Sequence, residues 1–363
     1  MNNSSVFVRK PSVSNKVIGT PVASYYGHRI KTGTVGIEIE LEGANFPKED
    51  EELPDEWQYH EDHSLRGEDN AEYVLRLPES FATAEDAVRR LFCVLDDNCV
   101  VIDDSPRTSV HVHLNFQKNC VNRIAAFSAL FFTVEEILSE WCGDHRAGNL
   151  FCLRAKDAPA IPALAKEIVS NNLGVSISSD YHYAGLNFES LQKFGSLEVR
   201  HMRGPKDAQE VIDWLKIVQR IYDMSDVFKS DPREICYKYS YEGPSRFFKD
   251  VFGPDLYPVV LAGLSEEWNE QKINDSVREG IRIAQDICFC VNWNAFEEPK
   301  EDPFGRTAKA APVVSSTQAV YDEYANINPI AESYIDYPTN TMPTATNPSV
   351  ALQNWESIFQ STS

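Results

Sequence analysis

The stretch from Val35 to Glu42 constrains the fold more than any other part of the chain, because apolar and acidic residues alternate along it. Successive side chains of a β-strand point to opposite faces of a sheet. As a strand, this stretch places its aliphatic side chains on one face and Glu38, Glu40 and Glu42 on the other. Carboxylates on one strand face recur every ~6.6 Å and repel each other unless solvent or a cation lies between them. The stretch therefore predicts one face in the core and an opposite face that is solvated or binds cations.

Residues 109–116 repeat this division between an apolar and a polar face. Val, Leu and Phe side chains alternate there with His111, His113 and Asn115. A strand would direct the two imidazoles to the same side of the sheet. This segment is the second in which polar groups gather on one face only.

Further strand-like segments add acidic and basic groups to the set. In residues 197–200, two aliphatic residues alternate with Glu198 and Arg200. Residues 71–78 are rich in β-forming residues and follow the extended residues 56–65 across a turn, which predicts a hairpin. Together, the polar faces of the predicted strands supply one candidate site: Glu38, Glu40, Glu72, His111, His113, Glu198 and Arg200.

The composition of this set favours a hard divalent cation. Carboxylates with one or two imidazoles suit Mg²⁺ or Mn²⁺, which prefer oxygen ligands and often also hold substrate phosphates. Because the residues come from at least four strands, a curved antiparallel sheet that lines a cleft would bring them together. We therefore expect an α+β fold in which helices cover the other face of the sheet.

Apolar residues at helical spacing predict the helices that cover this sheet. Residues 180–188 are expected to be extended, and residues 225–274 show no clear pattern. The predicted helices run from an N-cap at Thr83 to about residue 95, over 122–141, over 162–172, from a capping box at Asp207 to about residue 222, and over 277–291.

The chain divides into three parts by composition. Residues 1–30 form an N-terminal arm without periodicity, and residues 31–298 form the main domain. Residues 299–363 are rich in Pro, Thr and Asn, which predicts a tail that is largely disordered or wrapped over the domain.

Charge and cysteine usage exclude several classes of function. The net charge of −21 argues against a nucleic-acid-binding surface, which needs clustered Lys and Arg. The eight cysteines form no Cys-x-x-Cys pair, which favours free thiols in a reducing compartment. No apolar run has the length of a signal peptide or a membrane span. We expect a cytoplasmic protein, or one in the host cytoplasm if a virus encodes it.

Five short motifs in order resemble the amidoligase family, the ATP-dependent carboxylate–amine ligases that share the catalytic domain of glutamine synthetase and glutamate–cysteine ligase. The resemblance covers roughly residues 33–224. Each motif is weak alone, and their order makes them specific. The motifs are Gly-x-Glu-x-Glu (36–40), Asp-x-Ser-Leu (62–65) followed by Glu72, His-x-His-x-Asn (111–115), Leu-Asn (186–187) and Leu-Glu-Val-Arg (197–200).

The resemblance implies a role for each matched residue. Glu38 and Glu40 would bind different Mg²⁺ or Mn²⁺ ions, with Glu72 completing one of the two sites. The ion that holds the transferred phosphate of ATP would have His111 and Glu198 as ligands. His113 and Arg200 would contact the acyl phosphate or the substrate carboxylate, with help from Arg203. Asn187 would bind the cofactor, as would Arg146 and Asn149, which lie in an Arg-x-x-Asn-like turn.

Other interpretations of the same residues remain open. A His-x-His pair with a distant glutamate also suits a Zn²⁺ hydrolase. A ligase-like fold without turnover could serve as a binding or assembly protein. The histidines could be structural, and Glu198 with Arg200 could be a surface ion pair of little energy. For a ligase, the expected partners are a small-molecule or peptide carboxylate and an amine, and the oligomeric state stays open.

Overall fold

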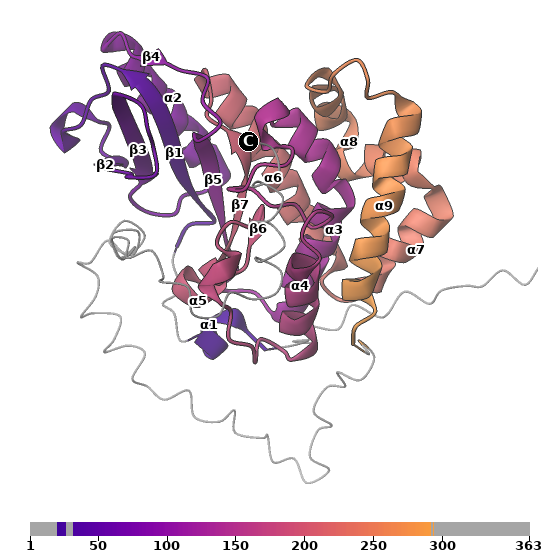
Figure 1. The fold of residues 1–363 in the computed structure, drawn as a ribbon. Coiled ribbons are helices and arrows are strands. Elements are labelled where there is room, and N and C mark those ends of the chain that lie inside the picture. The colour runs from indigo at the N-terminus through magenta and orange to yellow at the C-terminus, as the bar shows by residue number, and fades with distance from the viewer. Residues whose placement is uncertain (1–19, 27–31, 292, 294–363) are drawn as a thin grey trace, which may run out of the picture.

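The computed structural model describes residues 20–26, 32–291 and 293 of the chain. Its centre is an antiparallel sheet of seven strands, with helices packed against it (Figure 1). The α+β class expected from the sequence is confirmed. The strands lie in the order β2 (Trp57–His60), β3 (Asp69–Leu75), β1 (Val35–Ala44), β5 (Ser109–Asn115), β7 (Ser196–Arg203) and β6 (Leu186–Asn187), and the short β4 (Val101–Ile102) pairs with the end of β1.

Strand β1 has the two faces that its sequence predicts. Its four aliphatic side chains are at most 1 % exposed and belong to the hydrophobic core. The register then places Glu38 opposite His111 of β5 and Glu40 opposite Glu72 of β3. Hairpin β2–β3 is also present, with His60 opposite Glu72. The polar groups of adjacent strands therefore meet on the face of the sheet that turns away from the core.

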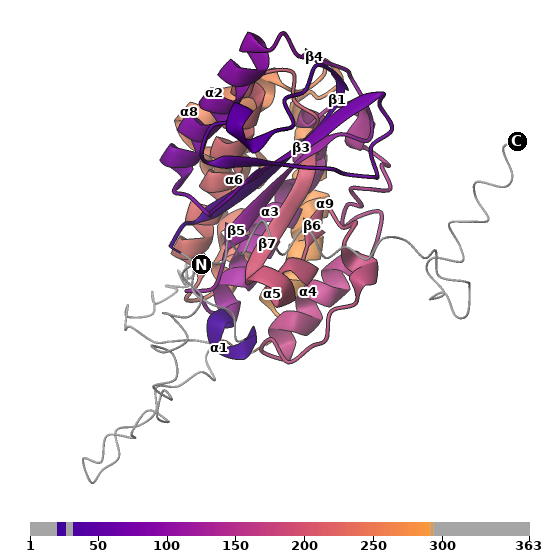
Figure 2. The ribbon, with the colours of Figure 1, turned by 90° about the vertical axis from the view of Figure 1, so that its left-hand side faces the viewer.

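Three long helices contact the strands, and Figure 2 shows the strands in front of the helical layer. These are α2 (Phe81–Asp97), α3 (Val121–Trp141) and α6 (Ala208–Phe228). Helix α3 is buried along almost its whole length, which explains why its sequence is apolar on nearly every side. Around it pack α4 (Ala160–Ser170), α7 (Arg233–Glu242), α8 (Pro244–Ala262) and α9 (Glu270–Cys288), while the short α1 (Val22–Tyr26) and α5 (Glu189–Phe194) contact each other.

Several predicted boundaries differ from the structure. Helix α2 begins before Thr83, because Ser80 is the N-cap and accepts a hydrogen bond from the Thr83 backbone N–H at 3.2 Å. Within the stretch 180–188, only Leu186 and Asn187 are extended. The unassigned stretch 225–274 contains α7, α8 and the first turn of α9.

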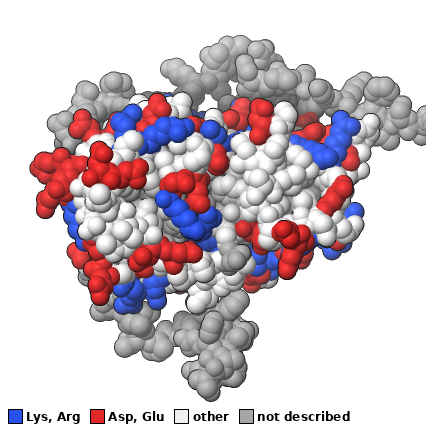
Figure 3. All heavy atoms as spheres, turned by 90° about the horizontal axis from the view of Figure 1, so that it is seen from above, with Lys and Arg blue, Asp and Glu red and all other residues white. Residues whose placement is uncertain are grey.

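The predicted tail, residues 299–363, lies outside the described residues, as does most of the predicted N-terminal arm. Each described helix is either too short or too polar to span a lipid bilayer. On the face of the molecule seen in Figure 3, basic side chains are interspersed with acidic ones.

Candidate metal centre

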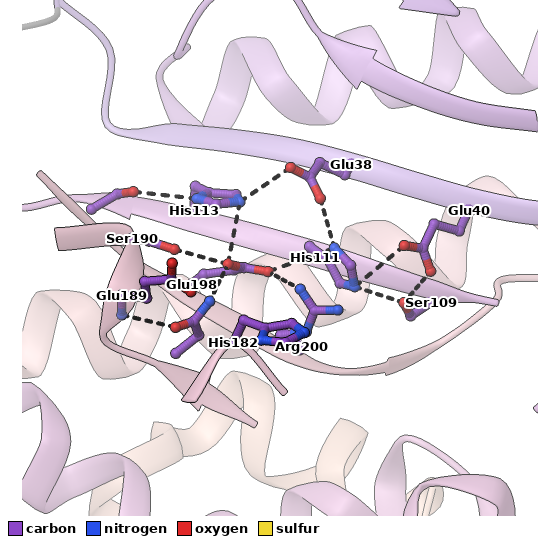
Figure 4. Close-up of polar contacts among 12 residues, drawn as sticks. Glu38, Glu40, Ser109, His111, His113, His182, Glu189, Ser190, Glu198 and Arg200 are labelled. Carbon is purple, nitrogen blue, oxygen red and sulfur yellow. Dashed lines mark hydrogen bonds and ion pairs between the residues drawn. The ribbon is translucent and has the colours of Figure 1, made fainter. Parts of the chain in front are cut away.

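A cluster of charged side chains lies on the polar face of the sheet (Figure 4). Glu38 comes from β1, His111 and His113 from β5, and Glu198 and Arg200 from β7. The two glutamates and two histidines are only 3–4 % exposed. Burying charged groups is costly unless they pair with opposite charges or bind a metal ion. The cluster is therefore not a solvated surface.

Three members of this cluster are placed to bind one cation. One ligand atom each from Glu38, His111 and Glu198 lie within 4.8 Å of one another. The Nδ1 atom of His111 is 2.6 Å from Oε2 of Glu38 and 3.6 Å from Oε1 of Glu198. Among the described residues, this is the group of three His, Cys, Asp or Glu side chains whose ligand atoms come that close together. We call these three residues the metal triad.

The histidines keep Glu38 ionised. Burial alone would raise the pKa of Glu38, but its hydrogen bonds to His111 and His113 hold the pKa well below its usual range. The Nε2 atom of His113 is 3.3 Å from Oε1 of Glu38, and its Nδ1 atom is 3.2 Å from the Ser196 hydroxyl. Burial would lower the pKa of His113, whereas the charges of Glu198 and Glu38 raise it. The Glu38 carboxylate is therefore ionised at neutral pH.

Glu198 receives hydrogen bonds from three side chains. The amide of Asn187 and the hydroxyl of Ser190 each donate to its Oε2 atom at 2.8 Å, and Arg200 donates to its Oε1 atom. Burial opposes ionisation, but the positive charges of Arg200, His113 and His111 lower the pKa of Glu198 to about 2. Its position and its charge are thus both fixed before any ligand arrives.

Glu40 and Glu72 have a different environment beside the metal triad. Ser109 donates a hydrogen bond to Glu40 at 2.5 Å, and the same hydroxyl lies 2.7 Å from Nε2 of His111. Burial raises the pKa of Glu40 and outweighs the opposing charges of His111, whose Nε2 atom is 3.7 Å from Oε1 of Glu40, and of Arg200. Burial and the charges of Glu38 and Glu40 raise the pKa of Glu72 well above its usual range, and no described residue donates a hydrogen bond to it. This pair therefore resists carrying two negative charges unless a cation joins it.

Three sequence-predicted residues lie apart from the metal triad. Arg146 is 1 % exposed, and its guanidinium donates to the backbone carbonyls of Arg200 and His201. The Asn149 amide donates to two loop carbonyls, and Arg203 pairs with a glutamate of α6 at 2.7 Å. Cofactor binding by Arg146 and Asn149 stays a prediction, and these contacts do not favour it.

The sequence interpretation missed several side chains that support the cluster. Ser109 and Ser196 lie two residues before His111 and Glu198, so the alternation of the strands already places them on the polar face. Ser190 lies on the short helix α5, and no period in the sequence directs it towards Glu198. Asn187 donates a hydrogen bond to Glu198 of the metal triad, and its predicted role in cofactor binding stays a prediction.

No protein-family model matches this chain. A comparison with curated proteins also gives no match. The resemblance to amidoligases therefore rests on the five motifs, which supply every residue of the metal triad as well as Arg200 and Asn187.

The residues of the cluster could bind a cation and an anion side by side. The metal triad offers two ionised carboxylates and an imidazole, a set that suits a divalent cation. Arg200 adds a fixed positive charge at its edge, and a guanidinium suits phosphate or carboxylate oxygens. A phosphate bound to a divalent cation has both of the required properties.

Proposed function

We propose that this protein is an ATP-dependent carboxylate–amine ligase that forms an amide bond through an acyl phosphate. The observation that carries the proposal is the metal triad, Glu38, His111 and Glu198, with Arg200 bonded to Glu198 at its edge. The five amidoligase-like motifs support the same reaction, since they contain these four residues in the family's order.

A carboxylate is a poor electrophile, so the reaction needs an activation step. An oxygen of the substrate carboxylate attacks the γ-phosphorus of ATP and ADP leaves. The amine then attacks the acyl carbon, loses a proton, and inorganic phosphate leaves with the electrons of the broken C–O bond. The products are the amide, ADP and phosphate.

The residues of the cluster have separate tasks in this reaction. A divalent cation held by Glu38, His111 and Glu198 would neutralise charge on the phosphate oxygens. Arg200 would bind the transferred phosphoryl group from the side. Asn187 and Ser190 hold the Glu198 carboxylate in one orientation, which preorganises the site.

The balance of ligand types favours Mg²⁺ or Mn²⁺ over the Zn²⁺ of a hydrolase. Four glutamates, Glu38, Glu40, Glu72 and Glu198, share this face of the sheet with three imidazoles, those of His60, His111 and His113. Hard divalent cations prefer such oxygen-rich sites, whereas catalytic zinc is usually held by imidazoles with at most one carboxylate. Metal analysis of the purified protein tests this preference: stoichiometric tightly bound Zn²⁺ would favour the hydrolase.

Calorimetry of ATP binding tests the ligase proposal. We expect the wild type to bind ATP in the presence of Mg²⁺ or Mn²⁺ and not in the presence of EDTA. Glu38→Gln should not bind ATP, because it retains the fold but loses a charged ligand. The matched control is Glu267→Gln, at a side chain that is 86 % exposed on a loop, and it should bind ATP like the wild type. Absence of ATP binding by the wild type in both metals would refute the proposal.

A further inference from the structure

The strand that carries Glu198 and Arg200 has a β-bulge that begins at Arg200. Val199 of β7 lies opposite Val112 of β5, and Met202 lies opposite Val110. Two residues of β7, Arg200 and His201, therefore face the one residue between these positions of β5. A bulge interrupts the hydrogen-bond ladder and redirects side chains, and bulges are frequent beside active sites.

The two residues of the bulge have different surroundings. The guanidinium of Arg200 bonds to Glu198 in the cluster. The ring of His201 is fully buried, packs against Phe131 and lies 3.2 Å from a carboxylate oxygen of Glu135, both on α3. One backbone irregularity thus joins the polar face of the sheet to the helical layer.

Arg146 bonds to the backbone at this point. Its Nε atom donates to the His201 carbonyl at 2.8 Å, and a terminal nitrogen donates to the Arg200 carbonyl. A buried carbonyl without a partner costs free energy, and the planar fork of a guanidinium suits two neighbouring oxygens. Arg146 therefore stabilises both carbonyls of the bulge.

The opposite side of the bulge is equally confined. The Arg200 backbone N–H donates to the Gly185 carbonyl at 2.9 Å. A Cβ atom on Gly185 would lie 2.2 Å from Cε1 of the His201 ring, so only glycine fits beside it. The backbone of Arg200 is held by contacts from two separate segments of the chain.

We propose that Arg146 is a positioning residue: its guanidinium fixes the bulge in β7 and thereby holds Arg200 against Glu198. The inference deepens the proposed function, on which the role of Arg200 in binding phosphate rests. Whether Arg146 holds Arg200 in place can be tested on the protein without any ligand.

The first test follows the Nε–H resonance of Arg200 by ¹⁵N NMR, assigned by its loss in Arg200→Lys. Arg146→Lys keeps the charge but replaces the fork by a point charge, so we expect the Arg200 resonance to shift or broaden. Arg123→Lys is the matched control, because Arg123 is also buried and donates to a backbone carbonyl, in the helical layer. An unchanged Arg200 resonance in folded Arg146→Lys would overturn the proposal.

The second test measures Mn²⁺ affinity in a double-mutant cycle. Loss of a supporting residue typically weakens metal binding 10–100-fold, so we expect about that loss in Arg146→Lys. In the Arg200→Lys background, the same change should weaken binding by less than about threefold, since its effect passes through Arg200. Equal losses in both backgrounds would mean that Arg146 has only a general structural role, and would overturn the proposal.

A further variant keeps the proposal testable if Arg146→Lys does not fold. Gly185→Ala pushes on the His201 ring from the other side and should move the same Arg200 resonance; no movement would overturn the proposal. The proposed function fails separately: a wild type without ATP binding, in which the Arg200 resonance still responds to Arg146→Lys, would reject the ligase and support the positioning role.

Discussion

At the level of single residues, the four glutamates of the polar face divide into two pairs. Glu38 and Glu198 have imidazole or guanidinium partners, and their pKa values are lowered. Burial raises the pKa values of Glu40 and Glu72, which lie directly opposite each other on the neighbouring strands β1 and β3. Like charges directly opposite on a sheet are destabilising. The first pair is thus ionised and ready to bind a cation, whereas burial of the second pair outweighs the nearby positive charges of His111 and Arg200.

Glu72→Gln should stabilise the metal-free protein, and more so at high pH. The ordinary pKa of this group is 4.5, and burial beside Glu38 and Glu40 raises its pKa in the folded protein. The folded state then binds the proton more tightly, so stability is lost as pH rises from about 4.5 through the folded pKa. Glutamine does not ionise and therefore avoids this loss of stability.

Urea unfolding in EDTA measures this difference at pH 5 and at pH 8. The advantage of Glu72→Gln over the wild type should be larger at pH 8. The same difference at both pH values would show that Glu72 does not titrate as its surroundings indicate.

Ser190→Ala should weaken Mn²⁺ binding about tenfold, although Ser190 is not itself a ligand. Its hydroxyl is one of three donors that orient Glu198, and loss of such a supporting group commonly weakens a metal site by that order. Ser139→Ala is the control, because Ser139 is equally buried on α3 and its hydroxyl has no hydrogen-bond partner among the described residues. Calorimetric titration with Mn²⁺ compares the affinities of the two variants. Equal affinities would contradict the role of Ser190 in orienting Glu198.

Residue-level prediction from the sequence succeeded where side-chain direction follows from a strand. The alternation in β1 and β5 places Glu38, His111 and His113 on one face, and the structure brings them together. It did not reach the contacts of Arg146, because a turn motif does not determine that a long side chain bonds to the backbone of a distant strand.

At the level of secondary structure, long periodic segments were predictable and short or interrupted ones were not. Helix α3 and strand β1 each carry one pattern along their length. Strand β6 has two residues, too few for a period. Helix α8 is interrupted at Gly253, which has a φ of 71° and precedes Pro254, so its amphipathic pattern breaks in the middle. The bulge in β7 arises from tertiary contacts that the strand's own sequence does not contain.

The contact between α3 and α9 requires a residue without a side chain at position 280. A Cβ atom on Gly280 would lie 2.5 Å from the Thr133 carbonyl oxygen and 2.6 Å from that of Phe132. Gly280→Ala should therefore force the helices apart and cost about 1–3 kcal/mol of stability, despite the better helix propensity of alanine.

Chemical denaturation measures the loss in Gly280→Ala. The neighbouring Glu279→Ala is the control, since Glu279 is exposed on the same helix and its substitution should change stability by less than about 0.5 kcal/mol. Near-equal stability of the two variants would mean that the helices separate at little cost.

At the level of the whole molecule, the sheet divides a hydrophobic interior from a charged face. The helical layer buries the apolar side of β1, β5 and β7, and this rigid layer fixes the register that aligns the metal triad. The fold class followed from the sequence because alternation determines which side of each strand is apolar. The packing of α7, α8 and α9 against α3 and α6 depends on distant contacts and did not follow.

Removal of residues 310–363 should leave the domain folded. The buried core runs from Val22 to Trp293, whose indole donates to the Cys288 carbonyl at 2.7 Å, so the shortened chain keeps every described core residue. We expect a melting temperature within about 2 °C of the full chain, because a change of 1 kcal/mol shifts it by roughly 2–4 °C in domains of this size. Thermal unfolding of both chains at one concentration makes the comparison. A fall of more than about 4 °C would show that the tail packs on the domain, and the tail would then belong to the unit whose stability holds the metal triad in place.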